Sequence, residues 1–443
     1  MIILYIIIGI SLICQMERGV FDTASYLRLF RLLKEKSPSL GEKRKLYVLI
    51  PALREQDIIE KTVLQFYEAD TPGFEIHTAI ITTLREKSTG QPTTEEIVTH
   101  SAKSGKLSEF KDKIQIFRDP DMYGNMATQL NYALGEIRKF SSSDALYIVY
   151  NADSIVSQAT FEKLYGLLAE NRGKEFVFQQ PCAYVREMSP SSGSFQNALS
   201  LYQSWYCLGH ESRLLNEYGK SLSNPRSSFL GIIVGHGSGM TLNMHEKNGG
   251  YPSKLLTEDL TFGFMLSANK VPILLLPTLE LADVPAKFAT FISQKSIWFW
   301  NYLGYFDCYK AARKKHHASR LLILLLHGMA AGGYWALSAV FIALPIISGI
   351  ILRSPLILCV SITSYSLFVI LPQYALFKKL PSILHQQGFE TTASNMGNTS
   401  FLKILPALCL VTVTDSIGPW IAISKRIAFF FTRKLPQKPK TED

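Results

Sequence analysis

The distribution of apolar residues divides the chain into two parts. Apolar runs crowd residues 1–14 and the region after residue 320, whereas residues 40–290 mix apolar and polar positions as a globular domain does. A chain of 443 residues is also too long for one small core. We therefore predict a membrane protein that carries one water-soluble domain.

The water-soluble part alternates between two periodicities. Short runs of β-branched and aromatic residues predict strands at 46–50, 76–83, 114–117 and 145–150. Helical spacing of apolar residues separates these runs, and Thr93 with Glu96 has the spacing of a capping box. The polar, lysine-rich residues 101–112 predict a solvated loop. Repeated strand–helix units of this length predict an α/β fold with a doubly wound, mostly parallel sheet.

The strand at 145–150 occupies the centre of this pattern. It is apolar along its whole length, as expected of a strand that is covered on both faces. It ends in the short polar turn Asn151-Ala152-Asp153. In open α/β sheets ligands bind beyond the carboxyl ends of the strands, so Asp153 is well placed for chemistry. The alternative is that Asp153 only helps to start the next helix.

Two further segments of the domain are candidates for chemistry. Glycines at alternate positions in 235–239 let a backbone approach a ligand closely, although a simple turn is the alternative and His236 alone is more often structural. Thr257-Glu258-Asp259 precedes an apolar helical pattern. Acids in a first helical turn are favoured by the helix dipole, so taken alone this segment indicates capping before catalysis.

The apolar segments predict how the chain meets a membrane. We expect an N-terminal anchor at 1–16, an amphipathic linker helix at 17–45, the globular domain at 46–286, interfacial helices at 287–319, transmembrane helices at 320–431 and a basic tail at 432–443. Spans are predicted at 321–345 and 356–376. The stretch 401–424 is interrupted by proline, glycine and aspartate, so a re-entrant hairpin or interfacial helix there would keep the basic tail cytoplasmic.

Charge and cysteine usage narrow the class of partner. The net charge is +10, but the lysines and arginines flank the apolar segments, which favours membrane lipids over nucleic acid. The six cysteines are scattered and form no C-x-x-C pair, so they predict neither a disulfide framework nor a zinc site. Neither G-x-G-x-x-G nor G-x-x-x-x-G-K-S/T occurs, which argues against an ordinary dinucleotide or P-loop site.

Four motifs follow one another in a fixed order along the domain. They are Pro51-Ala52 with Glu55, then Asn151-Ala152-Asp153, then Thr257-Glu258-Asp259, then Gln294 with Trp298. This order, followed by membrane segments, resembles the membrane-embedded family 2 glycosyltransferases, which include cellulose- and hyaluronan-synthase-like enzymes. The pattern of that family is P-A-x-N-E, D-A-D, T-E-D and Q-x-x-R-W. The likeness covers residues 45–300, and four motifs in order are far more specific than any one.

The resemblance implies a GT-A catalytic domain on the cytoplasmic face, a UDP- or GDP-sugar donor and a Mg²⁺ or Mn²⁺ cofactor. By position, Asp153 matches the metal-binding acid, Asp259 matches the general base and Glu258 is its neighbour in the motif. The donor-binding positions that it implies are Pro51, Ala52, Glu55, Glu86, Asp153 and Gln294, and the acceptor-binding positions are Gly237, Ser238 and Trp298.

The chain departs from the family pattern at several positions. Asn151 replaces the first Asp of D-A-D, and Ile297 replaces the Arg of Q-x-x-R-W. The second strand lacks the usual acidic pair, for which only Glu86 is a substitute, and no lysine follows Gly124. The lost Arg and Lys would donate hydrogen bonds to phosphates, so the pattern does not favour a cellulose or hyaluronan synthase.

The function that the resemblance implies is an inverting, multi-pass membrane glycosyltransferase. It would move a sugar to a lipid-linked or glycan acceptor in cell-envelope polysaccharide or glycolipid synthesis. One alternative is a polyprenyl-phosphate sugar synthase, whose acceptor phosphate needs little help from a general base. Another is an inactive relative that binds a nucleotide sugar and acts as a scaffold. The missing acids are the observation that supports this alternative.

Overall fold

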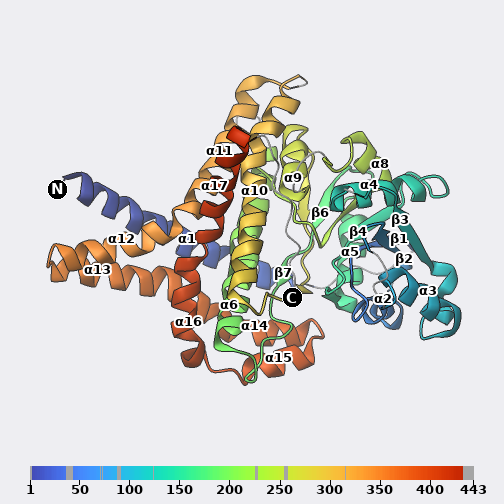
Figure 1. Cartoon of the computed structure of the whole chain (residues 1–443), viewed down its shortest axis with the longest axis horizontal. Coiled ribbons are helices and arrows are strands. Elements are labelled where there is room, and N and C mark those ends of the chain that lie inside the picture. Colours follow the sequence, from blue (N-terminus) through green and yellow to red (C-terminus); the bar gives the residue numbers. More distant parts are fainter. Residues whose placement is uncertain are drawn as a thin grey trace.

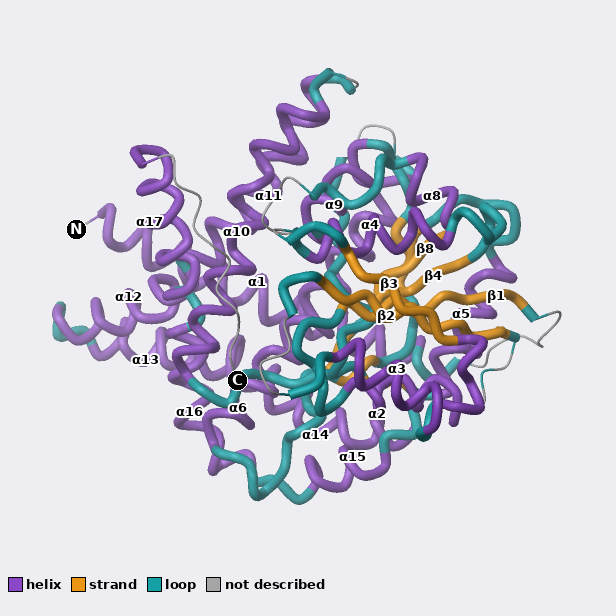
Figure 2. The backbone as a smooth tube through the Cα atoms, turned by 45° about the vertical axis from the view of Figure 1, so that its right-hand side comes forward, coloured by secondary structure: helices purple, strands orange, loops and turns teal. Residues whose placement is uncertain are grey.

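We describe the protein from a computed structural model that covers residues 2–35, 43–69, 71, 73–86, 91–122, 124–224, 228–253, 258–314 and 316–432. An α/β domain lies on one side and a group of long helices lies on the other, as Figure 1 shows. The strands gather inside the α/β domain and helices surround them (Figure 2).

A seven-stranded sheet forms the frame of the α/β domain. Its order is β3 (Ile114–Asp119), β2 (Phe74–Thr83), β1 (Arg44–Pro51), β4 (Leu146–Val149), β8 (Ser238–Thr241), β6 (Val177–Gln179) and β9 (Ile273–Leu275). All neighbours pair in parallel except β8, which is antiparallel to both β4 and β6. The predicted doubly wound, mostly parallel sheet is therefore confirmed. The carboxyl ends of β1, β2 and β4 meet at one edge.

The two faces of the sheet bury different side chains of the same strands. Leu46 and Val48 pack in a core with α2 (Ile59–Glu68) and α5 (Gln158–Glu170), whereas Tyr47 and Leu49 pack in a second core with α4 (Met126–Ile137). Successive side chains of a strand point to opposite faces, so burial on both faces requires the continuous apolar run in the sequence.

The segment between β2 and β3 differs in part from its prediction. The capping box of Thr93 and Glu96 is present and opens α3 (Thr94–Ser104). The solvated loop expected over 101–112 is wrong, because α3 continues through Ser104 and a 3-10 helix, η1 (Ser108–Lys113), follows.

Smaller elements complete the domain. A second sheet joins β5 (Ile155–Val156), β10 (Glu280–Leu281) and β7 (Cys182–Ala183). An aromatic-rich helical segment comprises α6 (Ser194–Trp205), a π-helical turn η2 (Tyr206–Glu211) and α7 (Ser212–Leu222). Helices α8 (Leu242–Lys247) and α9 (Asp259–Ala268) follow.

One continuous helix, α1 (Ile2–Leu32), replaces the separate anchor and linker helix expected at 1–16 and 17–45. It is 31 residues long and apolar enough to cross a membrane. Its polar residues near the expected boundary are paired inside the protein: Gln15 binds the Phe341 carbonyl and Ser364, and the fully buried Asp22 contacts Arg18 and Arg213. The polar stretch therefore does not end the helix.

Helix α10 (Phe288–Ala312) connects the domain to the other long helices. The expected interfacial helix instead packs against α9, α11 (Ala318–Ala336) and α17 (Ile417–Thr432), with Phe299 and Trp300 buried in those contacts. It stands upright beside α17 in Figure 1.

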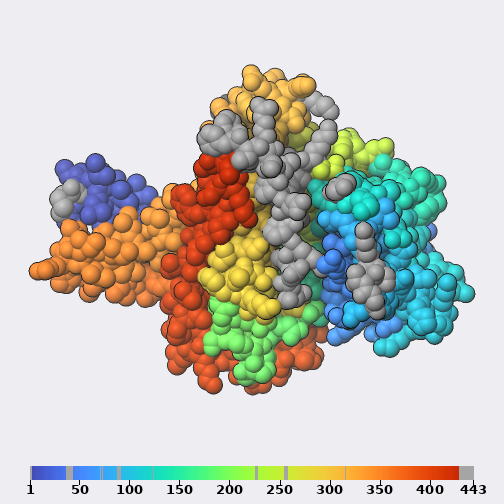
Figure 3. All heavy atoms as spheres, viewed as in Figure 1, coloured from blue at the N-terminus to red at the C-terminus, as the bar shows by residue number. Residues whose placement is uncertain are grey.

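The remaining helices form the candidate membrane region. Their bounds are α12 (Ser338–Ile351), α13 (Pro355–Tyr365), η3 (Ser366–Ile370), α14 (Leu371–Gln386), α15 (Glu390–Gly397) and α16 (Phe401–Thr414). Among the described residues, three helices are long and apolar enough to cross a membrane, at Ile2–Leu32, Pro355–Gln386 and Phe401–Ala428. The pair α11 and α12 is bent by 47° and would make a fourth if it is one span. The early part of α1 projects from the body with α12 and α13 (Figure 3).

The hairpin expected over 401–424 is wrong. That stretch lies within a single 28-residue candidate span, and the sharp bend lies between α11 and α12 instead. Asp415, which had argued against a span, forms an ion pair with Lys295 of α10 at 3.4 Å between Oδ1 and Nζ. A carboxylate that is paired inside the protein no longer opposes a membrane position.

Candidate active site

Asp259 lies at the start of α9 and faces the glycine-rich segment. Its Oδ2 accepts a hydrogen bond from the Gly235 N–H at 3.1 Å, and its Oδ1 accepts one from the Asn301 amide at 2.9 Å. Oδ1 also accepts the Leu260 N–H at 2.7 Å. The carboxylate is therefore held by three donors from three segments, which fixes its orientation more firmly than helix capping alone.

Glu258 lies beside Asp259 and is almost fully buried. It is the residue before the first turn of α9, yet its side chain makes no capping hydrogen bond to that turn. A Cβ atom added to Gly235 would lie 3.6 Å from Asp259 Oδ2 and 3.8 Å from Glu258 Oε1. Both acids therefore lie close to the glycine-rich segment.

Asp153 lies in the turn after β4. The Asn151 N–H donates to Ser154 Oγ at 3.0 Å and closes this turn, and Arg186 donates to the Asp153 carbonyl at 2.7 Å. No described residue donates a hydrogen bond to the half-buried Asp153 carboxylate. Helix α5 starts later, with Ser157 before its first turn. Helix initiation therefore does not explain Asp153.

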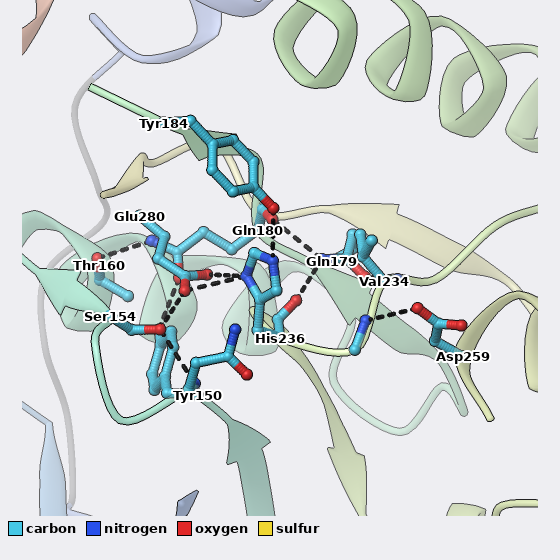
Figure 4. Close-up of polar contacts among 12 residues, drawn as sticks. Tyr150, Ser154, Thr160, Gln179, Gln180, Tyr184, Val234, His236, Asp259 and Glu280 are labelled. Atoms are coloured by element: carbon cyan, nitrogen blue, oxygen red, sulfur yellow. Dashed lines mark hydrogen bonds and ion pairs between the residues drawn. The ribbon is translucent and has the colours of Figure 1, made fainter. Parts of the chain in front are cut away.

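A buried polar network joins this turn to the glycine-rich segment. Ser154 Oγ donates to Glu280, whose Oε2 lies 2.9 Å from His236 Nδ1. His236 Nε2 lies 3.1 Å from the Tyr184 hydroxyl. In Figure 4, His236 lies between Glu280 and Tyr184, and Asp259 lies on the other side of the same segment. The turn of Asp153 and the carboxylate of Asp259 are thus connected through residues 235 and 236.

Two buried groups in this region have displaced pKa values. Burial disfavours the charged form of His236, but Glu280, with smaller contributions from Asp153 and Glu211, raises its pKa to about 9. The pKa of Glu211 is about 7, because burial and, less strongly, Asp259 raise it while Cys207, His236 and Lys295 lower it. Asp153 thus acts on His236 and Asp259 acts on Glu211, and these two buried groups also act on each other.

The comparison with known families decides the identity. Residues 148–377 match the family model described as glycosyl transferase family group 2. The chain belongs to this family. It is a glycosyltransferase, and its α/β domain is the GT-A domain that the order of the motifs implied.

Solved structures that are similar to this glycosyltransferase are distant in sequence. The mannosyltransferase PcManGT from Pyrobaculum calidifontis, in complex with GDP-Man and Mn²⁺, is 16% identical with a TM-score of 0.44, over 92% of this chain and 99% of that chain. TarS 1-349 from S. aureus is 14% identical with a TM-score of 0.38, over 87% and 92%. Its complex with UDP-GlcNAc is 13% identical with the same score and coverage. No curated protein matches the chain.

Four predicted donor-binding residues of this glycosyltransferase gather at the ends of β1 and β2. Pro51 ends β1, and the next N–H, of Ala52, donates to Ile81 of β2 at 2.9 Å. Thr94 joins the other two: it accepts from the Glu55 N–H at 3.0 Å and donates to Glu86 Oε1 at 2.7 Å. One oxygen of the buried Glu86 therefore stabilises the start of α3, which is a structural role that the sequence did not indicate.

Arg54 is a residue of this loop that the sequence did not single out. Its φ of 62° lies in the left-handed region, which is uncommon for a residue other than glycine. The family pattern P-A-x-N-E has asparagine at the corresponding place, and asparagine adopts this conformation readily. The arginine thus keeps the loop shape, and left-handed residues of this kind cluster at functional sites.

Gln294 and Trp298 are both half-buried on α10 and lie one helical turn apart. The Lys295 ammonium lies 4.5 Å from the centre of the Trp298 ring. Asn301, one turn further along, binds Asp259. Helix α10 thus carries the predicted pair Gln294 and Trp298 and also Asn301, which binds the predicted base. The sequence indicated only the pair.

The glycine-rich segment is more buried than the prediction of acceptor contact implied. Gly237 has a φ of +66°, and a Cβ atom there would lie 2.8 Å from Glu280 Oε2. Ser238 is 1% exposed, because it lies in β8 between Val149 of β4 and Gln179 of β6. The Ser238 side chain is buried in the described structure. The part of the glycine-rich segment that contacts Asp259 is instead Gly235.

Among the described residues, one set of three side chains has the spacing of metal ligands: Cys182, His236 and Glu280, with ligand atoms within 4.8 Å of one another. Asp153 does not belong to this set. Sulfur and imidazole suit zinc rather than Mg²⁺ or Mn²⁺, which prefer oxygen ligands. The His236–Glu280 contact already satisfies two members of the set. Cys182 therefore lies beside the buried network.

Proposed function

We propose that this protein is an inverting glycosyltransferase that moves a sugar from a UDP- or GDP-sugar to a lipid-linked or glycan acceptor. We place it in the cell membrane with several spans and its catalytic domain in the cytoplasm, in cell-envelope polysaccharide or glycolipid synthesis. The observation that carries the proposal is the position of Asp259, which is held by Gly235 and Asn301 beside the segment that leads to Asp153.

In the proposed reaction, Asp259 is the general base. The acceptor hydroxyl oxygen attacks the anomeric carbon of the donor sugar and forms the new glycosidic bond. The bond from that carbon to the diphosphate oxygen breaks, and its electron pair leaves with the nucleoside diphosphate. The hydroxyl proton moves to Asp259. One displacement inverts the anomeric configuration, and Glu258 adds negative charge beside the base.

Asp153 is proposed as the ligand of a divalent cation. Its carboxylate fits this role because it lies at the carboxyl end of β4 and accepts no hydrogen bond from the described residues. Mg²⁺ and Mn²⁺ commonly bind through one or two carboxylates together with substrate phosphates. When bound, such an ion supplies charge neutralisation to the diphosphate leaving group.

The remaining predicted residues have positions consistent with substrate binding. We assign Pro51, Ala52, Glu55 and Glu86 to the nucleotide side, because they gather at the carboxyl ends of β1 and β2, where α/β sheets bind ligands. Gln294 is assigned to the diphosphate, and Trp298 and Gly237 to the acceptor. An aromatic face such as that of Trp298 suits the apolar face of a sugar ring.

The membrane placement is supported by the candidate spans and by the basic residues near them. Three helices, or up to four, are long and apolar enough to cross a bilayer. Lys378 and Lys379 lie within α14, in the later part of the candidate span Pro355–Gln386, and basic residues are enriched on the cytoplasmic side.

A donor panel tests the proposal. Purified full-length protein with a membrane lipid extract and Mn²⁺ is incubated with UDP- and GDP-sugars, and nucleoside diphosphate release and the glycosylated product are measured. Asp259→Asn is expected to lower turnover by at least about 100-fold, because a general base contributes that much or more. The control is Asp144→Asn, since the exposed Asp144 precedes β4 at the opposite end of that strand.

Equal turnover of Asp259→Asn and the unchanged protein would remove Asp259 from the mechanism. Binding of a nucleotide sugar without any hydrolysis or transfer would instead favour a scaffold that has lost its activity. A product that is a single-sugar lipid phosphate would favour the polyprenyl-phosphate sugar synthase.

A further inference from the structure

A second candidate site lies between the membrane helices and the α/β domain. It is a cavity of about 680 Å³ lined by α1, η2, α7, α10 and α11. Its walls combine aromatic side chains, including Tyr302, Tyr305 and Trp335, with arginines from α1 and α7. A volume of this size accommodates a ligand rather than a few water molecules.

The charge of the cavity favours an anion. Arg18, Arg28 and Arg213 line it, and the cationic side chains of the lining outnumber its carboxylates. Arg18 and Arg213 share the buried Asp22, at 3.4 and 3.1 Å from their Nε atoms, and Arg213 also pairs with Glu17 of the lining. The side-chain partner that the described structure gives Arg28 is the neutral amide of Asn216. The guanidinium groups are thus held in place with positive charge in excess.

The cavity reaches the apolar outer surface of α1. Phe21 lines it and is 55% exposed. On the same helix, the apolar residues toward the N-terminus, among them Ile10, Ile13 and Val20, are also exposed. The candidate span α1 therefore carries apolar surface up to the rim of a cationic cavity, which is the arrangement that an amphiphile with an anionic head group requires.

The cavity shares helix α10 with the candidate base. Tyr302 and Tyr305 line it from α10, and Asn301, between them and Trp298 in sequence, donates to Asp259 at 2.9 Å. Tyr206 of η2 lines the cavity as well, and its hydroxyl lies 3.5 Å from that of Tyr302. A ligand bound there would therefore lie along the helix that orients Asp259.

We infer that this cavity binds the phosphate head group of the acceptor lipid, with Arg28 and Arg213 as anion ligands and the lipid chain along the outer surface of α1. Guanidinium groups bind phosphate oxygens through paired hydrogen bonds, which suits this head group. The inference rests on the proposed function, which it makes more specific: the acceptor is a glycan that is linked to a lipid through phosphate and reacts through a sugar hydroxyl, rather than a free oligosaccharide.

Binding of short lipid phosphates tests the inference without turnover. The full-length protein in neutral detergent is titrated by calorimetry with farnesyl monophosphate, farnesol and inorganic phosphate. We expect farnesyl monophosphate to bind, and farnesol and inorganic phosphate each to bind at least about ten-fold more weakly, because each lacks one half of the recognition. Arg28→Gln and Arg213→Gln should each weaken farnesyl monophosphate binding by about ten-fold or more.

The control is Lys247→Gln, which removes a cation from an exposed ion pair with Glu175 on the α/β domain and should leave lipid binding unchanged. Equal binding of farnesol and farnesyl monophosphate would overturn the inference, as would binding that ignores both arginines. Equal binding of inorganic phosphate would assign the cavity to a soluble anion and also overturn it.

UDP and GDP binding are measured on the same variants. Nucleotide binding that persists in Arg28→Gln while lipid binding falls separates this cavity from the donor site. If the unchanged protein turned over none of the donors, the proposed function would be overturned. The lipid-binding measurements would still test the cavity.

Discussion

His236 and Glu280 form a buried ion pair, with the imidazole Nδ1 2.9 Å from the carboxylate Oε2, although they lie 44 positions apart in the sequence. Glu280 is fully buried and also accepts a hydrogen bond from Ser154. The pair therefore fastens the glycine-rich segment to the turn of Asp153, and its loss should affect both.

Glu280→Gln is expected to destabilise the protein by about 3 kcal/mol, because it leaves a buried charged imidazole without its partner. Thermal denaturation of the purified protein in detergent measures this as a lower midpoint. The matched control is Glu175→Gln, which breaks the exposed pair with Lys247 and should cost less than about 1 kcal/mol. Similar midpoints for the two variants would contradict a stabilising role for the buried pair.

The same pair predicts how stability depends on pH. Burial opposes the charge on His236, but Glu280 raises its pKa to about 9, above the usual value of about 6.5. The folded protein therefore binds more protons than the unfolded chain between these values, so stability falls as pH rises through this window. Denaturation midpoints from pH 6 to 10 measure this slope. His236→Gln should flatten it, and an unchanged slope in that variant would assign the dependence to other groups.

Asn301→Ala should affect the proposed base without removing it. The Asn301 amide donates to Asp259 Oδ1 at 2.9 Å, and a donor to a carboxylate favours its charged form. We expect turnover to fall by about ten-fold and the acidic limb of the pH–rate profile to move to higher pH. The control is Asn269→Ala, an exposed asparagine on the far end of α9. A fall in rate without movement of that limb would indicate a general structural effect.

Gly237→Ala tests the shape of the glycine-rich segment. The residue has a φ of +66°, and the added Cβ would lie 2.8 Å from Glu280 Oε2 and 2.9 Å from the Gln180 carbonyl. We expect a loss of about 2 kcal/mol from strain and displacement. Gly219→Ala in α7 is the control, since no atom lies within 4 Å of its added Cβ, and it should be neutral or stabilising. Equal stability of both variants would show that the segment adapts freely.

The sequence predicted those parts of the fold that local pattern determines. Alternate side chains of β1 fill two different cores, so its run of apolar residues was enough to indicate a strand inside a doubly covered sheet. The order of the acids, through the family resemblance that it carries, indicated Asp259 as a site residue, and that role stays a prediction. These signals are written in neighbouring residues and need no knowledge of distant contacts.

Long-range pairing explains what the sequence did not predict. Asp415 appeared to interrupt an apolar helix, and Asp22 lies in the segment that was expected to be a separate linker, but each has a cationic partner elsewhere: Lys295 for Asp415 and Arg213 for Asp22. A hydropathy profile records the cost of burying a charge but not the presence of a distant partner. Arg213 is nearly two hundred positions from Asp22, and Lys295 is more than one hundred positions from Asp415. The roles of Glu280 and Asn301 also depend on long-range contacts, and neither residue lies in a recognisable motif.

Helix α10 has a consequence for how this glycosyltransferase can be handled. Asn301 of this helix donates a hydrogen bond to Asp259, and Lys295 of the same helix pairs with Asp415. The proposed base and a candidate membrane span are therefore both held by α10. A fragment that ends at residue 286 would keep every strand of the sheet but lose Asn301, which donates a hydrogen bond to the proposed base Asp259. The α/β domain and the candidate membrane helices therefore depend on each other through α10, and work on the candidate site needs the full chain.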